Sequence, residues 1–595
     1  MHPTLLHAVF EKAEALASRP VLWRNSGSAY HPLLWRDFAT RGRRCARGLL
    51  SLGLEPGANV CVLGTSEWPI ALLGVMAAGG APALLDERWP DAVLLAAIRR
   101  TGARLLLVER DYFARAQRLE KAVAGLCAWG IGDGTTEAPS LEAALARPDA
   151  ASESAVDERM AALTPGSRAA VLFTSGTTAE PKAVAVSHQS LLWTTEKLTR
   201  VLGFGEAETV LSLLPPALAA AQTVGLHLAL RHGAQIYLPR SGARPIDLLR
   251  EVRPTVVLAP PRAWERFART VEDRLSAEPP KRQKVERWAR GLALERNRRE
   301  AEQQSVAPSL AARCRLAATL VHDPLKLSLG LNRTRLLACV GGPAGEGVGE
   351  LFASLAAPLY EVYGQAETCG VSSVLVPEAA VLGTQGRPLP GLEVRLSDEG
   401  VFSVRGGNVC LGALEQGEGR PLADADGWWR TGDSGRLSTQ GLLEIDGRVE
   451  ELLTRRGGAK TAPRRLEERL RRIRLVRDAM IVGEQGTGLA ALLTLEPDAA
   501  ARFAVEHALP DEPARFIESS VVRGWIAQQI DQVNRELSEE ERIVDFALLP
   551  EPFSVAAGEL SSSGALRREA IAGRHARRIA ELCATARTRP RPLTA

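Results

Sequence analysis

The residues best suited to chemistry form a run of hydroxyl and glycine residues that ends in a lysine. They are Thr174, Ser175, Gly176, Thr177, Thr178 and Lys182. An apolar stretch, residues 169–173, comes directly before them and predicts a buried strand. Hydroxyl and backbone N–H groups can surround phosphate oxygens while a lysine neutralises their charge. The segment therefore predicts a phosphate-binding loop; a Ser/Thr-rich surface turn is the alternative that it leaves open by itself.

Four further short segments follow this loop along the chain. They are Val-Gly-Gly-Pro at 340–343, Tyr-Gly-Gln-Ala-Glu at 363–367, Trp-Arg-Thr-Gly-Asp at 429–433 and Gly-Arg-Val-Glu-Glu-Leu at 447–452. In this order and spacing the five segments resemble those of the AMP-forming adenylating enzymes, a superfamily that includes acyl-CoA synthetases, luciferases and peptide-synthetase adenylation domains. The loop that ends in Lys182 resembles the family's TSGTTGxPKG segment.

Within that superfamily the chain is most similar to long-chain fatty acyl-CoA synthetases. The similar segments are 261–265 before a long basic insertion, 457–463 after the hinge, and 533–534 and 552–553 leading into 558–560. The resemblance covers nearly the whole chain. It implies a large N-terminal α/β domain, joined by a hinge to a small α+β C-terminal domain that rotates between half-reactions.

The resemblance implies ATP-dependent activation of a long-chain fatty acid, with ATP, Mg²⁺ and CoA as cofactors. A carboxylate is a poor electrophile, so it must first attack the α-phosphorus of ATP and expel pyrophosphate. The acyl adenylate formed in this way is then cleaved by a thiol. That thiol belongs to CoA or to an acyl carrier protein, and the sequence does not separate the two.

The resemblance also implies roles for individual residues. The loop residues would hold the β- and γ-phosphates, with Thr178 and Lys182 catalytic, and Glu367 would be both catalytic and the Mg²⁺ ligand. The residues expected to line the adenine pocket are Gly341, Gly342, Tyr363 and Gly364. Asp433 would accept both ribose hydroxyls beside Arg448, and Glu450 takes the hinge position. Taken alone, Asp433 could equally be a turn residue, Arg448 a solvated charge and Tyr363 a core residue.

The chain departs from the family pattern at several contacts. Ala179 and Ala183 stand where the phosphate loop has glycine, which costs about 1 kcal/mol if a positive φ is needed. Ala366 replaces a threonine whose hydroxyl would meet the α-phosphate, and residues 216–218 lack an expected histidine.

The largest departure is Ala565, which stands where the family has its adenylation lysine. Losing one such preorganised donor typically costs about 10² to 10³ in rate. Lys460 is the only lysine after the hinge, so Arg567 or Arg568 would have to reach in from flanking positions. Three readings follow: an altered enzyme, an enzyme that keeps only the thioester half-reaction, and a noncatalytic scaffold that binds nucleotide or acyl adenylate.

Strands and helices that alternate along the chain must position these residues. Apolar strand-like runs alternate with amphipathic helical stretches over the first two thirds of the chain, which predicts α/β layers. A small β-rich subdomain is expected near 394–405. We therefore predict an N-terminal domain over 1–446, a mobile C-terminal domain over 447–586 and a disordered tail over 587–595.

Residues 262–316 carry 14 Lys and Arg against 8 Asp and Glu, which predicts an exposed, basic helical insertion with Trp264, Phe267, Trp288 and Leu292 on apolar faces. A peripheral contact with an anionic membrane is the more specific alternative. Two uncharged runs, 68–85 and 209–230, contain prolines and are expected to be buried strand, turn and helix segments rather than membrane spans.

Composition limits the remaining classes of function. The 595 residues carry 74 Lys and Arg against 70 Asp and Glu, a net charge of +4, which gives no broad basic face for nucleic acid. The eight cysteines form no CxxC pair, which opposes a zinc site or a disulfide framework. No secretory signal is recognisable at the start, so we expect a cytoplasmic protein, or one bound at the inner membrane face.

Overall fold

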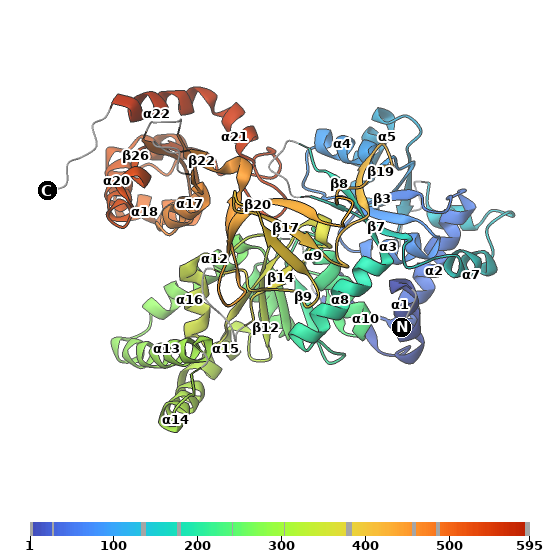
Figure 1. Ribbon diagram of the computed structural model, residues 1–595, viewed down its shortest axis with the longest axis horizontal. Helices are drawn as coiled ribbons and strands as arrows, with labels where there is room; N and C mark the ends of the chain where they lie inside the picture. The colour runs from blue at the N-terminus through green and yellow to red at the C-terminus, as the bar shows by residue number, and fades with distance from the viewer. Residues whose placement is uncertain are drawn as a thin grey trace.

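The computed structural model describes residues 4–26, 29–132, 139–174, 180–240, 242–302, 304–376, 384–454, 460–483 and 488–588. Over these residues two large sheets are packed with helices, and smaller sheets flank them (Figure 1). The mixed α/β architecture predicted from the alternating pattern is confirmed.

The first large sheet leads into the predicted phosphate loop. Its order is β19-β18-β8-β7-β4-β3-β5-β6, with β3 to β6 and β7 parallel and β8 antiparallel to β7. Its strands are β3 (Asn59–Leu63), β4 (Ala81–Leu84), β5 (Leu105–Glu109), β6 (Cys127–Ile131), β7 (Arg168–Phe173), β8 (Ala183–Ser187), β18 (Gly412–Glu415) and β19 (Glu418–Arg420). The central strands are apolar throughout because helices cover both faces of the sheet.

In the second large sheet, two parallel strands end at the segments that are predicted to bind the nucleotide. Its order is β15-β14-β13-β12-β11-β9-β10-β1-β2. Its strands are β1 (Pro20–Ser26), β2 (Ala29–Leu34), β9 (Thr209–Ser212), β10 (Gln235–Tyr237), β11 (Val256–Ala259), β12 (Leu336–Val340), β13 (Leu359–Tyr363), β14 (Ser373–Val374) and β15 (Arg387–Pro388). Neighbouring β12 and β13 run parallel, so the residues after them meet at one edge of the sheet.

Helices cover both sheets and fill the connections. In the N-terminal part they are α1 (Leu5–Ala15), α2 (Trp35–Ser51), α3 (Trp68–Ala77), α4 (Asp91–Thr101), α5 (Phe113–Ala122), α8 (His188–Leu202), α9 (Ala219–Gln222), α10 (Leu228–His232), α11 (Pro245–Val252) and α16 (Glu346–Ser354). The run 68–85 forms α3 and β4, and 209–230 includes β9 and α9, as predicted. No helix among the described residues is long and apolar enough to cross a bilayer.

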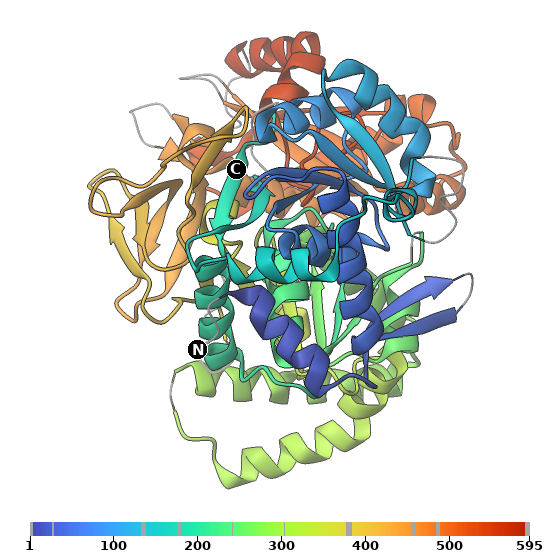
Figure 2. The ribbon, with the colours of Figure 1, turned by 90° about the vertical axis from the view of Figure 1, so that its right-hand side faces the viewer.

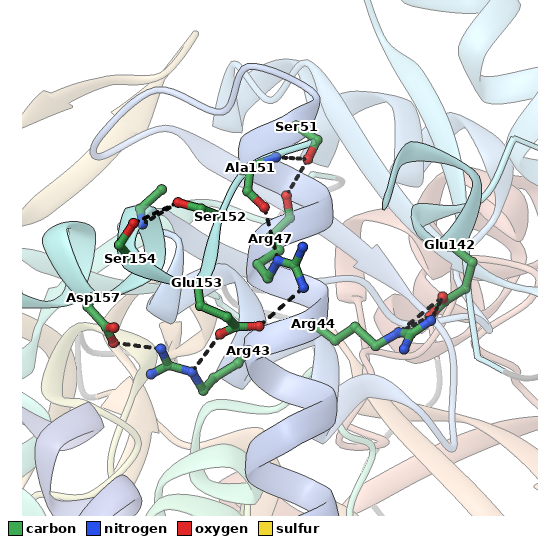
Figure 3. A network of polar contacts seen from close by, with 11 residues as sticks. Arg43, Arg44, Arg47, Ser51, Glu142, Ala151, Ser152, Glu153, Ser154 and Asp157 are labelled. Atoms are coloured by element: carbon green, nitrogen blue, oxygen red, sulfur yellow. Dashed lines mark hydrogen bonds and ion pairs between the residues drawn. The ribbon is translucent and has the colours of Figure 1, made fainter. Parts of the chain in front are cut away.

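Arginines of α2 tie two short neighbouring helices, α6 (Leu141–Leu145) and α7 (Glu153–Ala161), to the domain (Figure 3). Arg43 contacts Glu153 at 3.1 Å and Asp157 at 2.6 Å, and Arg44 donates to Glu142 at 3.0 Å. These pairs are exposed, so each contributes about 0 to 1 kcal/mol.

The C-terminal residues form smaller sheets with their own helices. A four-stranded sheet contains β16 (Glu393–Leu396), β17 (Val401–Arg405), β20 (Trp429–Leu437) and β21 (Leu443–Arg448), which matches the predicted β-rich subdomain. Beyond it lie β22 (Leu453–Thr454), β23 (Lys460–Thr461), β24 (Val476–Val482), β25 (Leu489–Leu495), β26 (Ile543–Leu549), α17 (Pro463–Arg471), α18 (Pro497–Glu506), α19 (Pro513–Glu518), α20 (Ser520–Arg535), α21 (Arg568–Arg574) and α22 (Ala576–Thr588). Residues 589–595 of the predicted tail lie outside the described residues.

The predicted insertion is helical, but its first helix is not exposed. It comprises α12 (Pro261–Ser276), α13 (Pro280–Ala301) and α14 (Pro308–Ala317), followed by α15 (Asp323–Leu329). Trp264 and Phe267 of α12 are buried in a core cluster with Phe352, and the Trp264 indole donates to the Ala338 carbonyl at 3.1 Å. The expectation of exposure is wrong for α12 because its apolar face covers the second sheet, whereas α13 and α14 lie at the edge of the molecule (Figures 1 and 2).

The opposite face of α12 meets the C-terminal domain through three ion pairs. Arg262 and Asp478 are 2.8 Å apart, Glu265 and Arg471 3.0 Å, and Arg269 and Glu496 3.2 Å. The three α12 residues are three or four positions apart, which is the spacing of neighbours on one side of a helix. Their charges alternate in sign along the helix, and each partner carries the opposite charge. We call this set of three pairs the α12 charge row.

Candidate active site

The ends of the predicted phosphate loop are joined by β7 and β8. The Thr174 N–H donates to the Lys182 carbonyl at 3.0 Å, and the Lys182 N–H donates to Thr174 Oγ1 at 3.2 Å. The Lys182 side chain is exposed. Between them, Ser175, Gly176, Thr177, Thr178 and Ala179 lie outside the described residues. The hairpin thus fixes both ends of the loop at the edge of the first sheet.

The cost predicted for alanine at a family glycine does not arise at Ala183. This residue lies within β8, pairs in register with Phe173 and is fully buried. It is absent from the described non-glycine residues with positive φ. Its methyl group therefore packs in the core without backbone strain.

A cavity of about 190 Å³ brings most of the other predicted residues together. It lies where β12 and β13 end, between the N-terminal domain and residues of the C-terminal domain. The predicted residues that line it are Gly341, Gly342, Tyr363, Gly364, Asp433 and Arg448. Two positions of departure, Ala366 and Ala565, line it as well. Residues more than two hundred positions apart in the sequence thus line the same cavity.

The Asp433 carboxylate is the most heavily contacted group in the cavity. Tyr363 Oη donates to Asp433 Oδ2 at 2.6 Å, and the Gln365 amide donates to the same oxygen. Arg448 Nη1 lies 3.5 Å from Oδ1 and donates to the Thr431 carbonyl at 2.7 Å. Burial raises the pKa of Asp433, and the Arg448 charge opposes that rise. The carboxylate is thus held in place as an acceptor directed at the cavity.

Glu367 lies in a short 3-10 turn, Ala366–Thr368, after β13 and is buried. Burial raises the pKa of its carboxyl, while the charges of Arg448 and Lys182 lower it. No group of three or more metal-ligating His, Cys, Asp or Glu side chains occurs in the described part of the chain. A single carboxylate nevertheless fits Mg²⁺, because this ion is commonly bound by one or two carboxylates together with substrate phosphates.

Two glycines of the cavity are closely approached by side chains of the C-terminal domain. A Cβ on Gly341, whose φ is +88°, would lie 2.9 Å from the Ser563 Cβ. A Cβ on Gly342 would lie 2.6 Å from Arg464 Nη2. Gly364 has a different constraint, because its Cβ would lie 2.5 Å from the Val371 backbone.

The segment that carries Ala565 is a tight turn docked on the N-terminal domain. The Ser561 N–H donates to the Ala565 carbonyl at 2.8 Å, and the Ala565 N–H donates to Ser561 Oγ at 3.1 Å. The Trp89 indole donates to Ser562 Oγ at 2.8 Å, and Arg88 donates to the Ser562 carbonyl at 3.0 Å. The turn therefore places residue 565 in the cavity wall, where its side chain is a methyl group.

Neither flanking arginine replaces the lysine in this arrangement. Arg568 Nη2 contacts both carboxylate oxygens of Glu467 at 2.7 Å, and neither Arg567 nor Arg568 lines the cavity. Lys460 lies in β23, and its side chain is outside the described set. Arg568 does not reach in from its flanking position, because Glu467 holds its guanidinium within the C-terminal domain.

The predicted hinge residue Glu450 follows β21 in a 3-10 turn, Val449–Glu451, and is exposed. The chain crosses here from the four-stranded sheet to the C-terminal helices. Across the junction Arg465 pairs with Asp446 at 2.7 Å.

Sequence reasoning missed three residues of the cavity. Gln365 contacts Asp433 and lies within the segment 363–367, which the sequence had already indicated. Its position in that segment could therefore have identified it as a site residue. Glu361 is half-buried on β13, and its removal from solvent raises its pKa to about 7. Arg464 reaches the cavity from α17. The last two had no sequence signal, because only the fold brings them to the nucleotide segments.

A larger cavity of about 680 Å³ lies between the domains. Its apolar lining includes Trp68, Leu213, Leu214, Ile236, Leu238, Phe553, Val555 and Leu560. Its charged lining is Glu87 with Arg88, Arg240, Arg262, Arg266 and Arg477. Within the described residues, Arg266 and Arg477 have no ion-pair partner. The space combines an apolar wall with an excess of positive charge.

Comparison with known proteins shows which family shares this arrangement. Residues 9–414 match the family model of the AMP-binding enzymes, and residues 450–587 match the model of the AMP-binding enzyme C-terminal domain. A long-chain-fatty-acid–CoA ligase of Gallus gallus is 29% identical over 98% of this chain and 82% of its own length. Another, from Mycobacterium bovis, is 27% identical over 97% of this chain and 96% of its own length.

Solved structures share the fold. An anthranilate CoA ligase in complex with anthranoyl-AMP superposes with a TM-score of 0.70 at 16% identity, over 97% of this chain and 98% of that one. A benzoate CoA ligase from Burkholderia xenovorans superposes with a TM-score of 0.69 at 19% identity, over 96% and 99% of the two chains.

Proposed function

Because the chain belongs to the AMP-binding enzyme family, we propose that it activates a long-chain fatty acid with ATP and transfers the acyl group to CoA. It is an AMP-forming acyl-CoA ligase with ATP, Mg²⁺ and CoA as cofactors. The observation that carries the proposal is the cavity in which Tyr363, Asp433 and Arg448 converge beside the end of the phosphate loop.

The proposed roles follow from this arrangement. Asp433 accepts the ribose hydroxyls, with its orientation fixed by Gln365 and Arg448. Lys182 and the loop hydroxyls hold the β- and γ-phosphates, and Glu367 holds Mg²⁺, which would supply charge neutralisation for the phosphates. A carboxylate oxygen of the fatty acid bonds to the α-phosphorus, and the bond to pyrophosphate breaks. A thiolate then bonds to the acyl carbon, and AMP leaves with the bridging oxygen.

The proposal divides the chain at the predicted boundary, with 1–446 as the N-terminal domain and 447–586 as the mobile C-terminal domain. The two family models leave residues 415–449 between them, which supports a junction in this region. Glu450 at the 3-10 turn after β21 is the proposed hinge.

We place the acyl chain and the acceptor thiol in the larger cavity. Its apolar wall suits an acyl chain and a pantetheine arm, and Arg266 and Arg477 suit the phosphates of CoA. This charge favours CoA over a carrier protein as acceptor. Replacing both arginines by alanine is expected to raise KM for CoA at least tenfold without changing KM for ATP. An unchanged KM for CoA would count against this placement, and turnover with a carrier protein that has a free pantetheine thiol, but not with CoA, would favour the other acceptor.

The test of the main proposal uses the purified protein with MgATP, CoA and fatty acids of graded length. Mass spectrometry is expected to find AMP and acyl-CoA in equal amounts, both dependent on the fatty acid. ADP in place of AMP, or AMP without any acyl product, would contradict it.

One observation favours a second candidate function. The cavity wall at Ala565 has no lysine, and the flanking Arg568 is paired elsewhere. Under this alternative the protein performs only the thioester half-reaction, or binds nucleotide or acyl adenylate as a scaffold. Synthetic acyl adenylate with CoA separates the cases. Acyl-CoA from the adenylate but not from MgATP indicates the half-reaction alone, and no product from either indicates the scaffold.

We further propose that the outer helices contact an anionic membrane. Leu316 and Leu320, at the end of α14 and in the turn after it, are 53% and 58% exposed, and Leu327 on α15 is 51% exposed. Arg313 and Arg315 beside them are exposed too. A leucine patch flanked by cations suits an anionic lipid surface. Flotation with vesicles containing anionic lipid is expected for the unaltered protein and lost when all three leucines become serine; flotation retained by that variant would contradict the proposal.

A further inference from the structure

Among the described residues that follow the proposed hinge at Glu450, Arg464 is the one cation that lines the small cavity. It stands in the first turn of α17, directly after Pro463, which fixes the start of this helix. Its guanidinium packs against Gly342, where a Cβ would lie 2.6 Å from Nη2. Glycine at 342 thus leaves the space that Arg464 enters.

Among the described lining residues one other cation occurs, Arg448, and it already has protein partners. Arg448 donates to the Thr431 carbonyl at 2.7 Å and lies 3.5 Å from Asp433. Arg464 has only a 3.4 Å ion pair with Glu468 on its own helix, and its side chain is 37% exposed. Arg464 lines the cavity together with Asp433 and Glu361. Burial raises the pKa of both carboxyls, and the Arg464 charge opposes that rise. Its guanidinium donors are therefore available to a ligand.

Charge in the cavity also favours this use of Arg464. Three carboxylates, Glu361, Asp433 and Glu451, line the space with two guanidinium groups. A nucleotide brings further negative charge, so a cation that faces the ligand reduces the repulsion. The chain has lost two family contacts to the nucleotide, at Ala366 and Ala565, and Arg464 adds one from a different element.

We propose that Arg464 binds the purine end of the nucleotide, so that the C-terminal domain itself completes the nucleotide site. A guanidinium is planar and only donates hydrogen bonds, and a purine offers both ring-nitrogen acceptors and a π face. The Gly342 backbone, against which Arg464 packs, belongs to the segment that lines this end. The proposal rests on the proposed function and names one more residue of the same site.

The proposed contact couples nucleotide binding to the motion of the C-terminal domain. If Arg464 contacts the nucleotide only while Ala565 lines the cavity, nucleotide binding and this domain orientation stabilise each other. Rotation of the C-terminal domain then withdraws Arg464 and lowers the affinity for AMP, which aids product release after acyl transfer.

The test measures AMP affinity by calorimetry, which requires no turnover. Arg464→Ala is expected to weaken AMP binding by about tenfold to hundredfold, the range for a hydrogen bond from a charged group. Arg464→Lys keeps the charge but not the planar group and is expected to restore little. Arg469→Ala is the matched control, because Arg469 is on the same helix, outside the cavity, and paired with Glu536 at 3.5 Å.

A kinetic measurement separates a binding role from loosening of α17. Arg464→Ala is expected to raise KM for ATP and for synthetic acyl adenylate, because both carry the purine, whereas loosening of α17 would also lower the melting temperature. AMP affinity unchanged in Arg464→Ala, or weakened equally in Arg469→Ala, would overturn the inference and leave the proposed function intact. Absence of AMP binding by the unaltered protein would contradict both.

Discussion

At the scale of single residues, we propose that Ala565 limits the rate of adenylation. Its turn is docked on the N-terminal domain, and Ala565 lines the cavity. Ala565→Lys is expected to raise the rate of ATP–pyrophosphate exchange by about 10² to 10³. Ala557→Lys, an exposed position in the preceding segment, is the control and is expected to change nothing. Equal rates in the unaltered protein and Ala565→Lys would show that another group already performs the step.

Asp433 allows binding and stability to be separated. Burial raises the pKa of this carboxyl, so its ionised form costs folding free energy above that pKa. Asp433→Asn removes the buried charge and keeps the shape. We expect AMP affinity to fall at least tenfold while the melting temperature at pH 7 stays the same or rises. A melting temperature that falls together with affinity would indicate a structural role instead.

The residues of the cavity also show what sequence reasoning can reach. Tyr363, Asp433 and Arg448 were predicted as one set, because each stands in a short segment with a recognisable pattern. Arg464 and Glu361 were not, because their places depend on how α17 and β13 pack against those segments. Tertiary packing leaves no local pattern at such positions.

At the scale of elements, the α12 charge row connects the insertion to the C-terminal domain. The Glu265 and Arg471 side chains are 14% and 17% exposed, so their pair is only partly screened. A double-mutant cycle with Glu265→Ala and Arg471→Ala is expected to give a coupling free energy of about 0.5 to 3 kcal/mol in thermal or urea unfolding. Glu272→Ala with Arg471→Ala serves as the control cycle, because Glu272 is exposed on the same helix. Additive effects in the first cycle would contradict a stabilising contact.

Two buried histidines make the packing of α8 against the turn Thr223–His227 dependent on pH. Burial lowers the pKa of His188 to about 4 and of His227 to about 3, with each ring also near another histidine. Neither ring has a hydrogen-bond partner among the described residues. Both pKa values lie below the unfolded value of about 6.5, so the unfolded chain binds more protons in acid.

The contribution of the two histidines to the free energy of unfolding is therefore expected to be highest above pH 6.5 and to fall between pH 6.5 and 4. Each group contributes up to about 1.4 kcal/mol per pH unit over this range. Urea unfolding as a function of pH checks this, and His227→Gln is expected to flatten the slope while the exposed control His31→Gln does not. An unchanged slope in His227→Gln would contradict the assignment.

The elements also differ in how far the sequence predicted them. The apolar run 169–173 was correctly predicted to be a strand, β7, because buried strands require such runs. The exposure of α12 was predicted incorrectly. The sequence indicated an apolar face with Trp264 and Phe267, but the net charge over 262–316 does not indicate that this face packs in the core. Charge averaged over a segment does not reveal which face packs.

At the scale of the whole molecule, the two domains enclose the nucleotide cavity together. The β20 and β21 strands supply Asp433 and Arg448, and the C-terminal domain supplies Arg464 and the turn with Ala565. This enclosure matches the adenylation half-reaction, in which water must be kept from the reacting phosphate. The thioester half-reaction requires access for a thiol, and the larger cavity between the domains offers that path.

The central claim is that a fatty acid carboxylate attacks the α-phosphorus of ATP in this protein. The most direct test uses a long-chain fatty acid with ¹⁸O in both carboxyl oxygens, together with MgATP and CoA. We predict that AMP acquires one ¹⁸O and that the acyl-CoA keeps one, because the bridging oxygen leaves with AMP. AMP free of ¹⁸O, formed at any rate by the unaltered protein, would contradict it.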